Sequence, residues 1–227
     1  MAYSTILFDA DGTLFDYDRA EEFALASSFR KYGIQFSQER NSLYREINDG
    51  KWKQFEAGVI SKDELQTSRF AGLFAALGIA NIDAARFNKD YLGYLACGSE
   101  LIDGAVEVCR SLSATMRLAI ITNGIATVQL SRFSKSEIKD YISYMFVSEE
   151  IGYAKPDARY FDFVFDRMGP LGKPGVLVVG DSLTSDIQGG VNYGLDTCYY
   201  NPRKLENLSG IKPTFEIGSL AEIFDWI

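Results

Sequence analysis

The sequence predicts an α/β fold in which helices cover both faces of a central parallel β-sheet, with an all-helical segment inserted after the first strand. Three observations predict it. From Ile102 onward, short apolar runs alternate with helical stretches, which is typical of buried parallel strands. The segment between Tyr17 and Cys97 repeats its apolar residues every three or four positions and contains no proline. One apolar run, TILF at 5–8, precedes that segment, and only the later strands could cover it, so it belongs to the same sheet.

The apolar runs give the expected positions of the other strands, which are 117–122, 144–147, 175–179, 197–200 and 214–217. Helices are predicted at 105–112, 157–168 and 187–193, with further helical segments between 123 and 141. Three glycines, Gly33, Gly58 and Gly78, divide the inserted segment into four or five helices. We therefore expect a core domain made of residues 1–16 and 99–227, and a helical cap domain made of residues 17–98.

The chain of 227 residues contains no histidine, and this excludes several kinds of active site. A Ser-His-Asp triad, a Cys-His dyad and a histidine-ligated zinc ion all need that side chain. With 23 lysines and arginines against 31 aspartates and glutamates, the net charge is -8. Nucleic acids and anionic membranes bind basic surfaces, so neither is an expected partner.

The cysteines and the first residues predict a cytoplasmic protein. Cys97, Cys109 and Cys198 are far apart and form no CxxC pattern, so we expect three buried free thiols. The opening residues, MAYSTILFDADGTLFD, lack the basic region of a signal peptide. No apolar run reaches the roughly 18 residues of a membrane span.

Polar and acidic residues follow the ends of the predicted strands, where ligands bind in an open parallel sheet. The side chains there that can bind a metal ion or an anion are Asp9, Asp11, Thr122, Lys155, Asp181 and Asp186. Carboxylates gathered in one cleft repel each other unless a cation neutralises them. Hard oxygen ligands without sulfur or imidazole favour Mg²⁺. The sequence therefore predicts a magnesium site at this edge of the sheet.

The spacing of Asp9 and Asp11 favours acid–base and nucleophilic chemistry. Residues two apart in an extended segment point the same way, and without histidine a carboxylate nucleophile beside a carboxylic acid is the economical arrangement. Thr122, the backbone near Asn123 and Lys155 would hold the oxygens of a phosphoryl group. Each motif alone also has an ordinary explanation, as a glycine turn, a loop start, a solvated lysine or a helix N-cap. Together, and at strand ends, they favour phosphoryl transfer.

Four segments resemble the motifs of the haloacid dehalogenase (HAD) superfamily: ILFDADGTL, IITNG, the lysine of YAKPD, and VVGDSLTSD. The resemblance spans nearly the whole chain and implies a Rossmann-like, three-layer core with a helical cap between the first two motifs. It implies that Asp9 is a nucleophile that forms an aspartyl-phosphate, and that Asp11 is the general acid and base. The implied phosphate-binding residues are Thr122, Asn123 and Lys155. The implied Mg²⁺ ligands are Asp9, Asp11 through its backbone carbonyl, Asp181, and Asp186 directly or through water.

The same resemblance narrows the reaction and the substrate. Asp11 favours a phosphatase, because the haloacid dehalogenases lack an acid at that position, and the sugar phosphomutases rely on a cap histidine. The cap segments NDGKWKQFE and LQTSRF, with the later run GDSLTSDIQGGVNYGLDTCYYN, resemble the pyrimidine 5′-nucleotidase branch. Aromatic faces and polar groups bind a base, and the candidates are Phe15, Tyr17, Trp52 and Arg69. The alternative is that Trp52 packs in the cap core and Arg69 pairs with a neighbouring acid.

The expected function is that of a Mg²⁺-dependent phosphomonoester hydrolase that acts on nucleoside 5′-monophosphates as a monomer or homodimer. One alternative is a phosphoglycolate or sugar-phosphate phosphatase with the same catalytic residues. The other is a non-catalytic binding module on the same core, although every catalytic position carries a competent residue.

Overall fold

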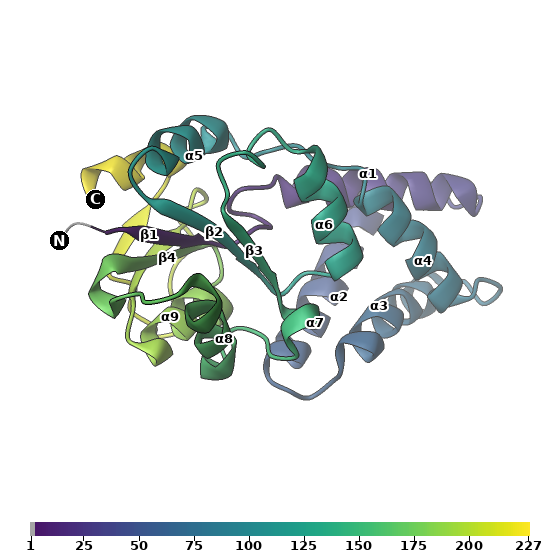
Figure 1. Cartoon of the computed structure of the whole chain (residues 1–227). Helices are drawn as coiled ribbons and strands as arrows, with labels where there is room; N and C mark the ends of the chain where they lie inside the picture. The colour runs from purple at the N-terminus through teal and green to yellow at the C-terminus, as the bar shows by residue number, and fades with distance from the viewer. Residues whose placement is uncertain (1–2) are drawn as a thin grey trace. The chain divides into compact units, whose positions relative to one another are not determined.

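The computed structural model describes residues 3–227, which form two compact units, drawn in Figure 1. The core unit contains the first strand, continues to Tyr17 and resumes at Ser99. The cap unit spans Asp18–Gly98. The predicted boundaries, after residues 16 and 98, differ from these by one residue at the first position. Residues 1 and 2, which the prediction assigned to the core, lie outside the described residues.

Within the described residues, the core unit contains a six-stranded sheet in the order β3-β2-β1-β4-β5-β6, and every neighbouring pair is parallel. The strands are β1 (Thr5–Phe8), β2 (Arg117–Thr122), β3 (Tyr144–Val147), β4 (Val176–Gly180), β5 (Asp196–Tyr200) and β6 (Phe215–Ile217). The strand order reverses at β1, so the carboxyl end of β1 lies between those of β2 and β4 (Figure 1). Such a reversal is where open α/β sheets bind their ligands.

The central strands are buried because both of their faces are covered. All four residues of β1 are fully buried, and Phe8 is in register with Ile120 of β2 and Val179 of β4. Side chains of a strand alternate between the two faces of its sheet. Ile6 and Phe8 accordingly join one hydrophobic cluster, whereas Leu7 joins the other.

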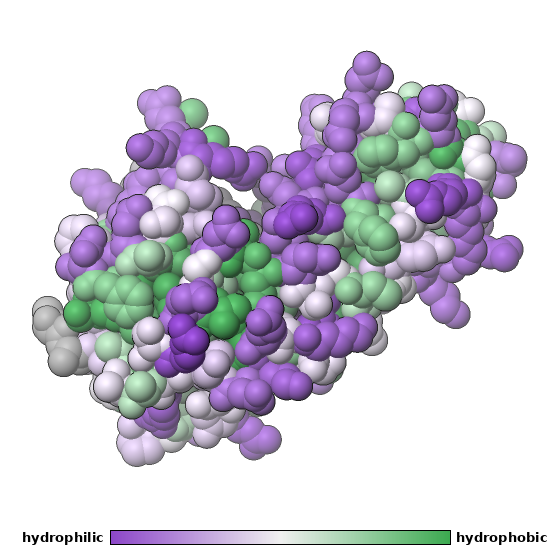
Figure 2. Space-filling model, turned by 90° about the horizontal axis from the view of Figure 1, so that it is seen from above, coloured by the Kyte–Doolittle hydropathy of each residue, from purple (hydrophilic) through white to green (hydrophobic). Residues whose placement is uncertain are grey.

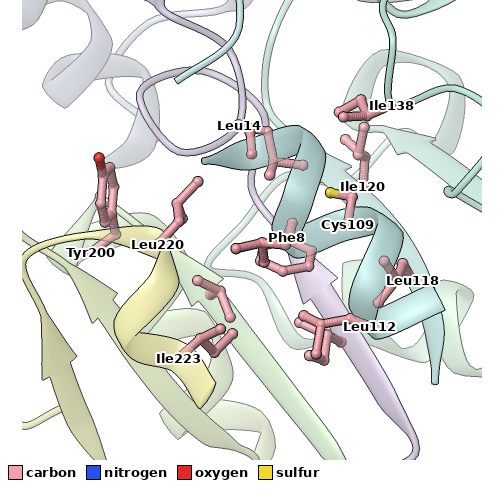
Figure 3. Close-up of a cluster of buried hydrophobic side chains, with 14 of the residues drawn as sticks. Phe8, Leu14, Cys109, Leu112, Leu118, Ile120, Ile138, Tyr200, Leu220 and Ile223 are labelled. Carbon is pink, nitrogen blue, oxygen red and sulfur yellow. The ribbon is translucent and has the colours of Figure 1, made fainter. Parts of the chain in front are cut away.

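The two clusters correspond to two helical layers. On one face lie α5 (Ala105–Ser113) and the 3₁₀ segment η3 (Leu220–Asp225), and Figure 3 shows Phe8 among Cys109, Leu112 and Ile223. On the other face lie α8 (Ala158–Met168) and α9 (Gln188–Tyr193), where Tyr160, Phe161 and Val164 cluster with Leu7 and Val178. The remaining elements of the core unit are α6 (Ala126–Lys135), α7 (Ser148–Ile151), η1 (Lys173–Gly175) and the π-helical turn η2 (Leu183–Ile187).

The cap unit consists of helices separated by glycines, as its periodicity predicts. Its helices are α1 (Tyr17–Lys31, beginning at the last residue of the core unit), α2 (Gln38–Glu56), α3 (Lys62–Leu77) and α4 (Ala84–Leu95). Gly33, Gly58 and Gly78 follow α1, α2 and α3 with positive φ angles. The bundle packs around Phe70, whose ring centroid lies 4.8 Å from that of Phe87 and 5.0 Å from that of Tyr91.

Several local features differ from the sequence prediction. The short segments α7 and η3 are not predicted, because four to six residues are too few to show a helical period. Cys109 and Cys198 are buried free thiols, but Cys97 is exposed, so the prediction of three buried thiols is wrong there. Cys97 lies just beyond α4, which ends at Leu95 and is capped by Ala96.

Figure 2 shows hydrophilic residues spread over the visible face, with hydrophobic areas between them. Among residues 3–227, no helix is long and apolar enough to cross a bilayer.

Replacing Gly190 with alanine is expected to destabilise the core unit. A Cβ at this position of α9 would overlap Cγ2 of Thr197 and lie 3.3 Å from Cγ2 of Val178. Overpacking of this kind costs about 1–3 kcal/mol of unfolding free energy, which urea denaturation measures.

Gly50→Ala is the matched control, because Gly50 also lies within a helix but a Cβ there meets no other part of the chain within 4 Å. We expect its urea midpoint to be unchanged or raised, since alanine is the better helix former. An unchanged midpoint for Gly190→Ala would contradict the close packing of α9 on the sheet.

Candidate functional site

The candidate site lies at the carboxyl ends of the three central strands. Asp9 directly follows β1, Thr122 is the last residue of β2, and Asp181 directly follows β4. Lys155 comes from the loop between α7 and α8, and Asp186 from the turn η2. The parallel register brings these five residues, which are far apart in sequence, to one edge of the sheet.

Three carboxylates form a compact cluster at this edge. Asp9, Asp181 and Asp186 each offer an oxygen atom, and these three atoms lie within 4.8 Å of one another. Glycines make this approach possible. A Cβ on Gly180 would overlap the carboxylate of Asp186, and a Cβ on Gly12, whose φ is +83°, would overlap that of Asp181.

Lys155 is buried inside the carboxylate cluster. Its Nζ atom donates to Oδ1 of Asp9 and to Oδ1 of Asp186, both at 2.6 Å, and to the backbone oxygen of Ile121 at 2.7 Å. Its side chain is 1% exposed. A lysine so deep in the protein is stable only when its charge is paired and its protons are bonded.

The side chain of Asn123 holds the Lys155 segment in place. Its Oδ1 accepts from the backbone N–H of Lys155 at 2.9 Å, and its Nδ2 donates to the backbone oxygen of Lys155 at 2.8 Å and to Oγ of Ser185 at 3.3 Å. Sequence reasoning assigned Asn123 to phosphate binding through nearby backbone N–H groups. Its side chain connects the β2 loop to the loops that carry Lys155 and Asp186, and phosphate binding by the nearby backbone N–H groups stays a prediction.

The cluster carries more negative charge than its lysine balances. Burial raises the pKa of Asp9 well above its ordinary value, Lys155 lowers it, and Asp186 and Asp181 raise it further. Burial and the neighbouring Asp186 raise the pKa of Asp181 to about 7. Burial alone would lower the pKa of Lys155, but Asp186 and Asp9 more than offset this and raise it.

The donor set fits a divalent cation. When all three carboxylates are ionised, they and the one ammonium carry a net charge of two minus, which a divalent ion would balance. All of the side-chain donors are carboxylate oxygens, which suit a hard cation.

The carboxylate of Asp11 is bound elsewhere. Its Oδ1 accepts from Nη1 of Arg132 and its Oδ2 from Nε2 of Gln129, both on α6. It is close enough to Asp181 to raise the pKa of that residue. Sequence reasoning missed Arg132 and Gln129. The sequence feature that could have indicated their role is that these two polar residues, three positions apart, lie on the buried face of α6.

The four residues predicted to bind a base lie in different surroundings. Phe15 is fully buried in the core unit, with the guanidinium of Arg132 4.8 Å from its ring centroid, and Tyr17 begins α1 at the end of that unit. Trp52 is half-buried on α2, edge-to-face with Phe55 at 5.8 Å.

Arg69 is buried in the cap unit and holds three helices together. Its Nη1 donates to Oδ1 of Asn48 at 3.2 Å, and its Nη2 to Oδ1 of Asn88 at 2.8 Å. Asn48 in turn donates to Oε2 of Glu21, which also accepts from Arg45. Glu21 is thus the acid in the same network as Arg69, and the alternative, that Arg69 pairs with a neighbouring acid, stays open.

Comparison with known proteins places this geometry in a family. The family model described as haloacid dehalogenase-like hydrolase matches residues 3–194. The chain belongs to the haloacid dehalogenase-like hydrolases. This confirms the predicted family and the predicted α/β fold.

The relatives within this family cover nearly the whole chain. The pyrimidine 5′-nucleotidase PynA of Streptococcus pneumoniae is 37% identical over 99% of this chain and 95% of its own length. The pyrimidine 5′-nucleotidase YjjG of Escherichia coli is 33% identical over 98% and 97%. The crystal structure of the HAD-hydrolase YfnB of Bacillus subtilis, bound to magnesium, is 37% identical with a TM-score of 0.95, covering 99% of this chain and 98% of that one.

The raised pKa of Asp181 predicts how pH changes the stability of the metal-free protein. Because Asp181 holds its proton up to about pH 7 when folded but loses it near its ordinary, lower pKa when unfolded, stability should fall as pH rises through this interval. Asp181→Asn removes an ionisable group from the cluster. We expect it to raise the thermal midpoint at pH 8 without divalent ions, and to change it less at pH 5.

Thermal unfolding in EDTA at the two pH values measures this effect. Asp140→Asn is the control, because Asp140 is exposed and outside the cluster. A lower midpoint for Asp181→Asn at pH 8 would show that the carboxylate is not repelled in the folded protein.

Proposed function

We propose that this hydrolase cleaves phosphate monoesters of nucleosides, with Mg²⁺ bound by Asp9, Asp181, Asp186 and the backbone carbonyl of Asp11. The observation that carries the proposal is the buried cluster of three carboxylates around Lys155 at the strand reversal. The magnesium bound in the YfnB structure supports the choice of metal. The names of PynA and YjjG support the choice of substrate.

In the first step, a carboxylate oxygen of Asp9 attacks the phosphorus atom in line with the leaving nucleoside oxygen. The Asp9 O–P bond forms, the ester P–O bond breaks, and Asp11 transfers a proton to the leaving oxygen. The products are the free nucleoside and an aspartyl-phosphate on Asp9. When bound, Mg²⁺ would neutralise the negative charge of the phosphoryl oxygens and of the carboxylates.

In the second step, Asp11 takes a proton from a water molecule as its oxygen attacks the phosphorus. The bond between phosphorus and Asp9 breaks, and inorganic phosphate leaves. Lys155 fixes Oδ1 of Asp9 by its 2.6 Å hydrogen bond, so the nucleophile is held in one orientation in both steps. Thr122, the backbone near Asn123 and Lys155 are the proposed ligands of the transferring phosphoryl group, and Lys155 would exchange one of its three hydrogen bonds for a phosphoryl oxygen.

Recognition of the nucleoside is the finer part of the proposal. Phe15, Tyr17, Trp52 and Arg69 are the predicted contacts with the base. Tyr17 and Trp52 are partly exposed, whereas Phe15 and Arg69 are buried and would have to be uncovered to touch it. The cap segments that resemble the pyrimidine 5′-nucleotidase branch support a nucleotide substrate. A small-molecule phosphate is thus the proposed partner, and action in the cytoplasm and as a monomer or homodimer remain predictions.

Asp9→Asn is expected to reduce kcat by at least about 10³-fold, because the amide is a poor nucleophile. The measurement is phosphate release from UMP, dUMP and CMP beside phosphoglycolate and glucose 6-phosphate, with and without EDTA. Wild-type activity should require a divalent ion and prefer the nucleotides.

The control is again Asp140→Asn, with unchanged turnover expected. Turnover near wild type in Asp9→Asn would contradict the covalent mechanism. A preference for glycolate or sugar phosphates would favour the alternative phosphatase, and no hydrolysis of any monoester would favour a binding module.

Gly12→Ala is expected to weaken Mg²⁺ binding at least about tenfold, because the new Cβ displaces the carboxylate of Asp181. Isothermal titration calorimetry of the metal-free protein with MgCl₂ measures the affinity. Gly104→Ala is a matched control with the same φ of +83° and no neighbouring atom within 4 Å of the Cβ. Both variants strain the backbone, and only Gly12→Ala should lose affinity. Equal affinities in the two variants would contradict the placement of the metal beside Asp181.

A further inference from the structure

The carboxylate of Asp11 is held by two side chains that the proposed reaction does not use. Arg132 donates to its Oδ1 and Gln129 to its Oδ2, so each oxygen accepts one hydrogen bond. Asp11 does not belong to the group of carboxylates within 4.8 Å of one another. The α6 contacts therefore determine the orientation of this side chain.

The two donors are built into the fold. Arg132 is 0% exposed and Gln129 is 1% exposed, and residues three apart lie on the same face of a helix. Burying an arginine and a glutamine is costly unless both are bonded, so their placement needs a specific partner. The carboxylate of Asp11 is the partner that accepts from Nη1 of Arg132 and from Nε2 of Gln129.

Neighbouring residues keep both donors in position. The guanidinium of Arg132 lies over the ring of Phe15, 4.8 Å from its centroid, which restricts the plane of the guanidinium. The side chain of Gln129 passes over Gly124, where a Cβ would overlap it. Glu149 accepts from the backbone N–H of Ala126 at 2.7 Å and so holds the first turn of α6.

We propose that Arg132 and Gln129 are positioning residues that hold the Asp11 carboxylate for both proton transfers, an inference that rests on the proposed function. One hydrogen bond to each oxygen fixes the plane of the carboxylate and uses one lone pair of each oxygen. The remaining lone pairs carry the proton that moves to the leaving oxygen and later comes from water. A carboxylate that rotates freely loses this alignment, and misplacement by about 1 Å can cost about 10²-fold in rate.

The proposal predicts a dependence on the leaving group. A nucleoside alkoxide is a poor leaving group and needs the proton from Asp11 as the P–O bond breaks, whereas p-nitrophenolate leaves without it. The value of kcat/KM reports the steps up to the formation of the aspartyl-phosphate. Loss of the positioning contacts should therefore lower kcat/KM for UMP much more than for p-nitrophenyl phosphate.

The experiment uses the full chain with Mg²⁺ and the variants Gln129→Met, Arg132→Met and Arg132→Lys. We expect Gln129→Met and Arg132→Met to lower kcat/KM for UMP by about 10- to 100-fold, and that for p-nitrophenyl phosphate by less than about threefold. Arg132→Lys keeps a cationic donor and should recover part of the loss on UMP. Gln129→Met changes no charge, so it tests the proposal even where loss of Arg132 disrupts folding.

Val128→Ala is the matched control. Val128 is a buried neighbour on α6 whose apolar side chain has no donor for Asp11, so its replacement should lower the thermal midpoint without changing the ratio of the two kcat/KM values. Equal losses on both substrates in Gln129→Met and Arg132→Met, as for a purely structural defect, would overturn the inference. Unchanged kinetics on both substrates would overturn it as well.

Asp11→Asn separates this inference from the proposed function. A selective loss on UMP in Asp11→Asn, without one in the α6 variants, overturns the positioning role alone. The absence of a selective loss in Asp11→Asn overturns the acid role of Asp11, and the positioning role with it. Phosphate release from Asp9→Asn tests the nucleophile independently of both.

Discussion

Repulsion among buried carboxylates is the constraint on which the rest of the site depends. Asp9, Asp181 and Asp186 are brought within 4.8 Å of one another, and a single ammonium, that of Lys155, lies among them. Burial and the closeness of the other carboxylates both disfavour ionisation, which is why the pKa values of Asp9 and Asp181 are raised. The same arrangement destabilises the metal-free fold and fits a cation that would balance the charge.

The sheet tolerates this repulsion because its strands are buried on both faces. β1 contributes four fully buried residues between β2 and β4, and the clusters around Phe8 and Leu7 bind it to helices on either side. Burial of apolar side chains, worth about 25 cal/mol per Å², is the main stabilising term available. The carboxylates are thus attached to rigid elements, which is how proteins keep strained functional groups in place.

Different elements of the fold provide different groups of charged side chains. The strand-end loops provide the carboxylate cluster and Lys155, with Asn123 tying two of these loops together. Helix α6 provides Arg132 and Gln129, which bind Asp11 and keep it out of the cluster. In the cap unit, Arg69 forms a separate buried network with Asn48 and Asn88. Two acids that are two residues apart in the chain, Asp9 and Asp11, therefore have different neighbours and can take different roles.

The parallel sheet, the inserted helices and the residues at the strand ends could be predicted from the amino-acid sequence, because periodicity and the order of motifs are local features of the chain. Which helix faces which residue emerges only from the packed fold. The partners of Asp11 lie more than a hundred residues away on α6, Arg69 bonds the amides of Asn48 and Asn88 on two other helices, and Cys97 is exposed beyond the end of α4. These outcomes depend on how helices dock against the sheet and one another, and long-range docking leaves no periodic signal in the sequence.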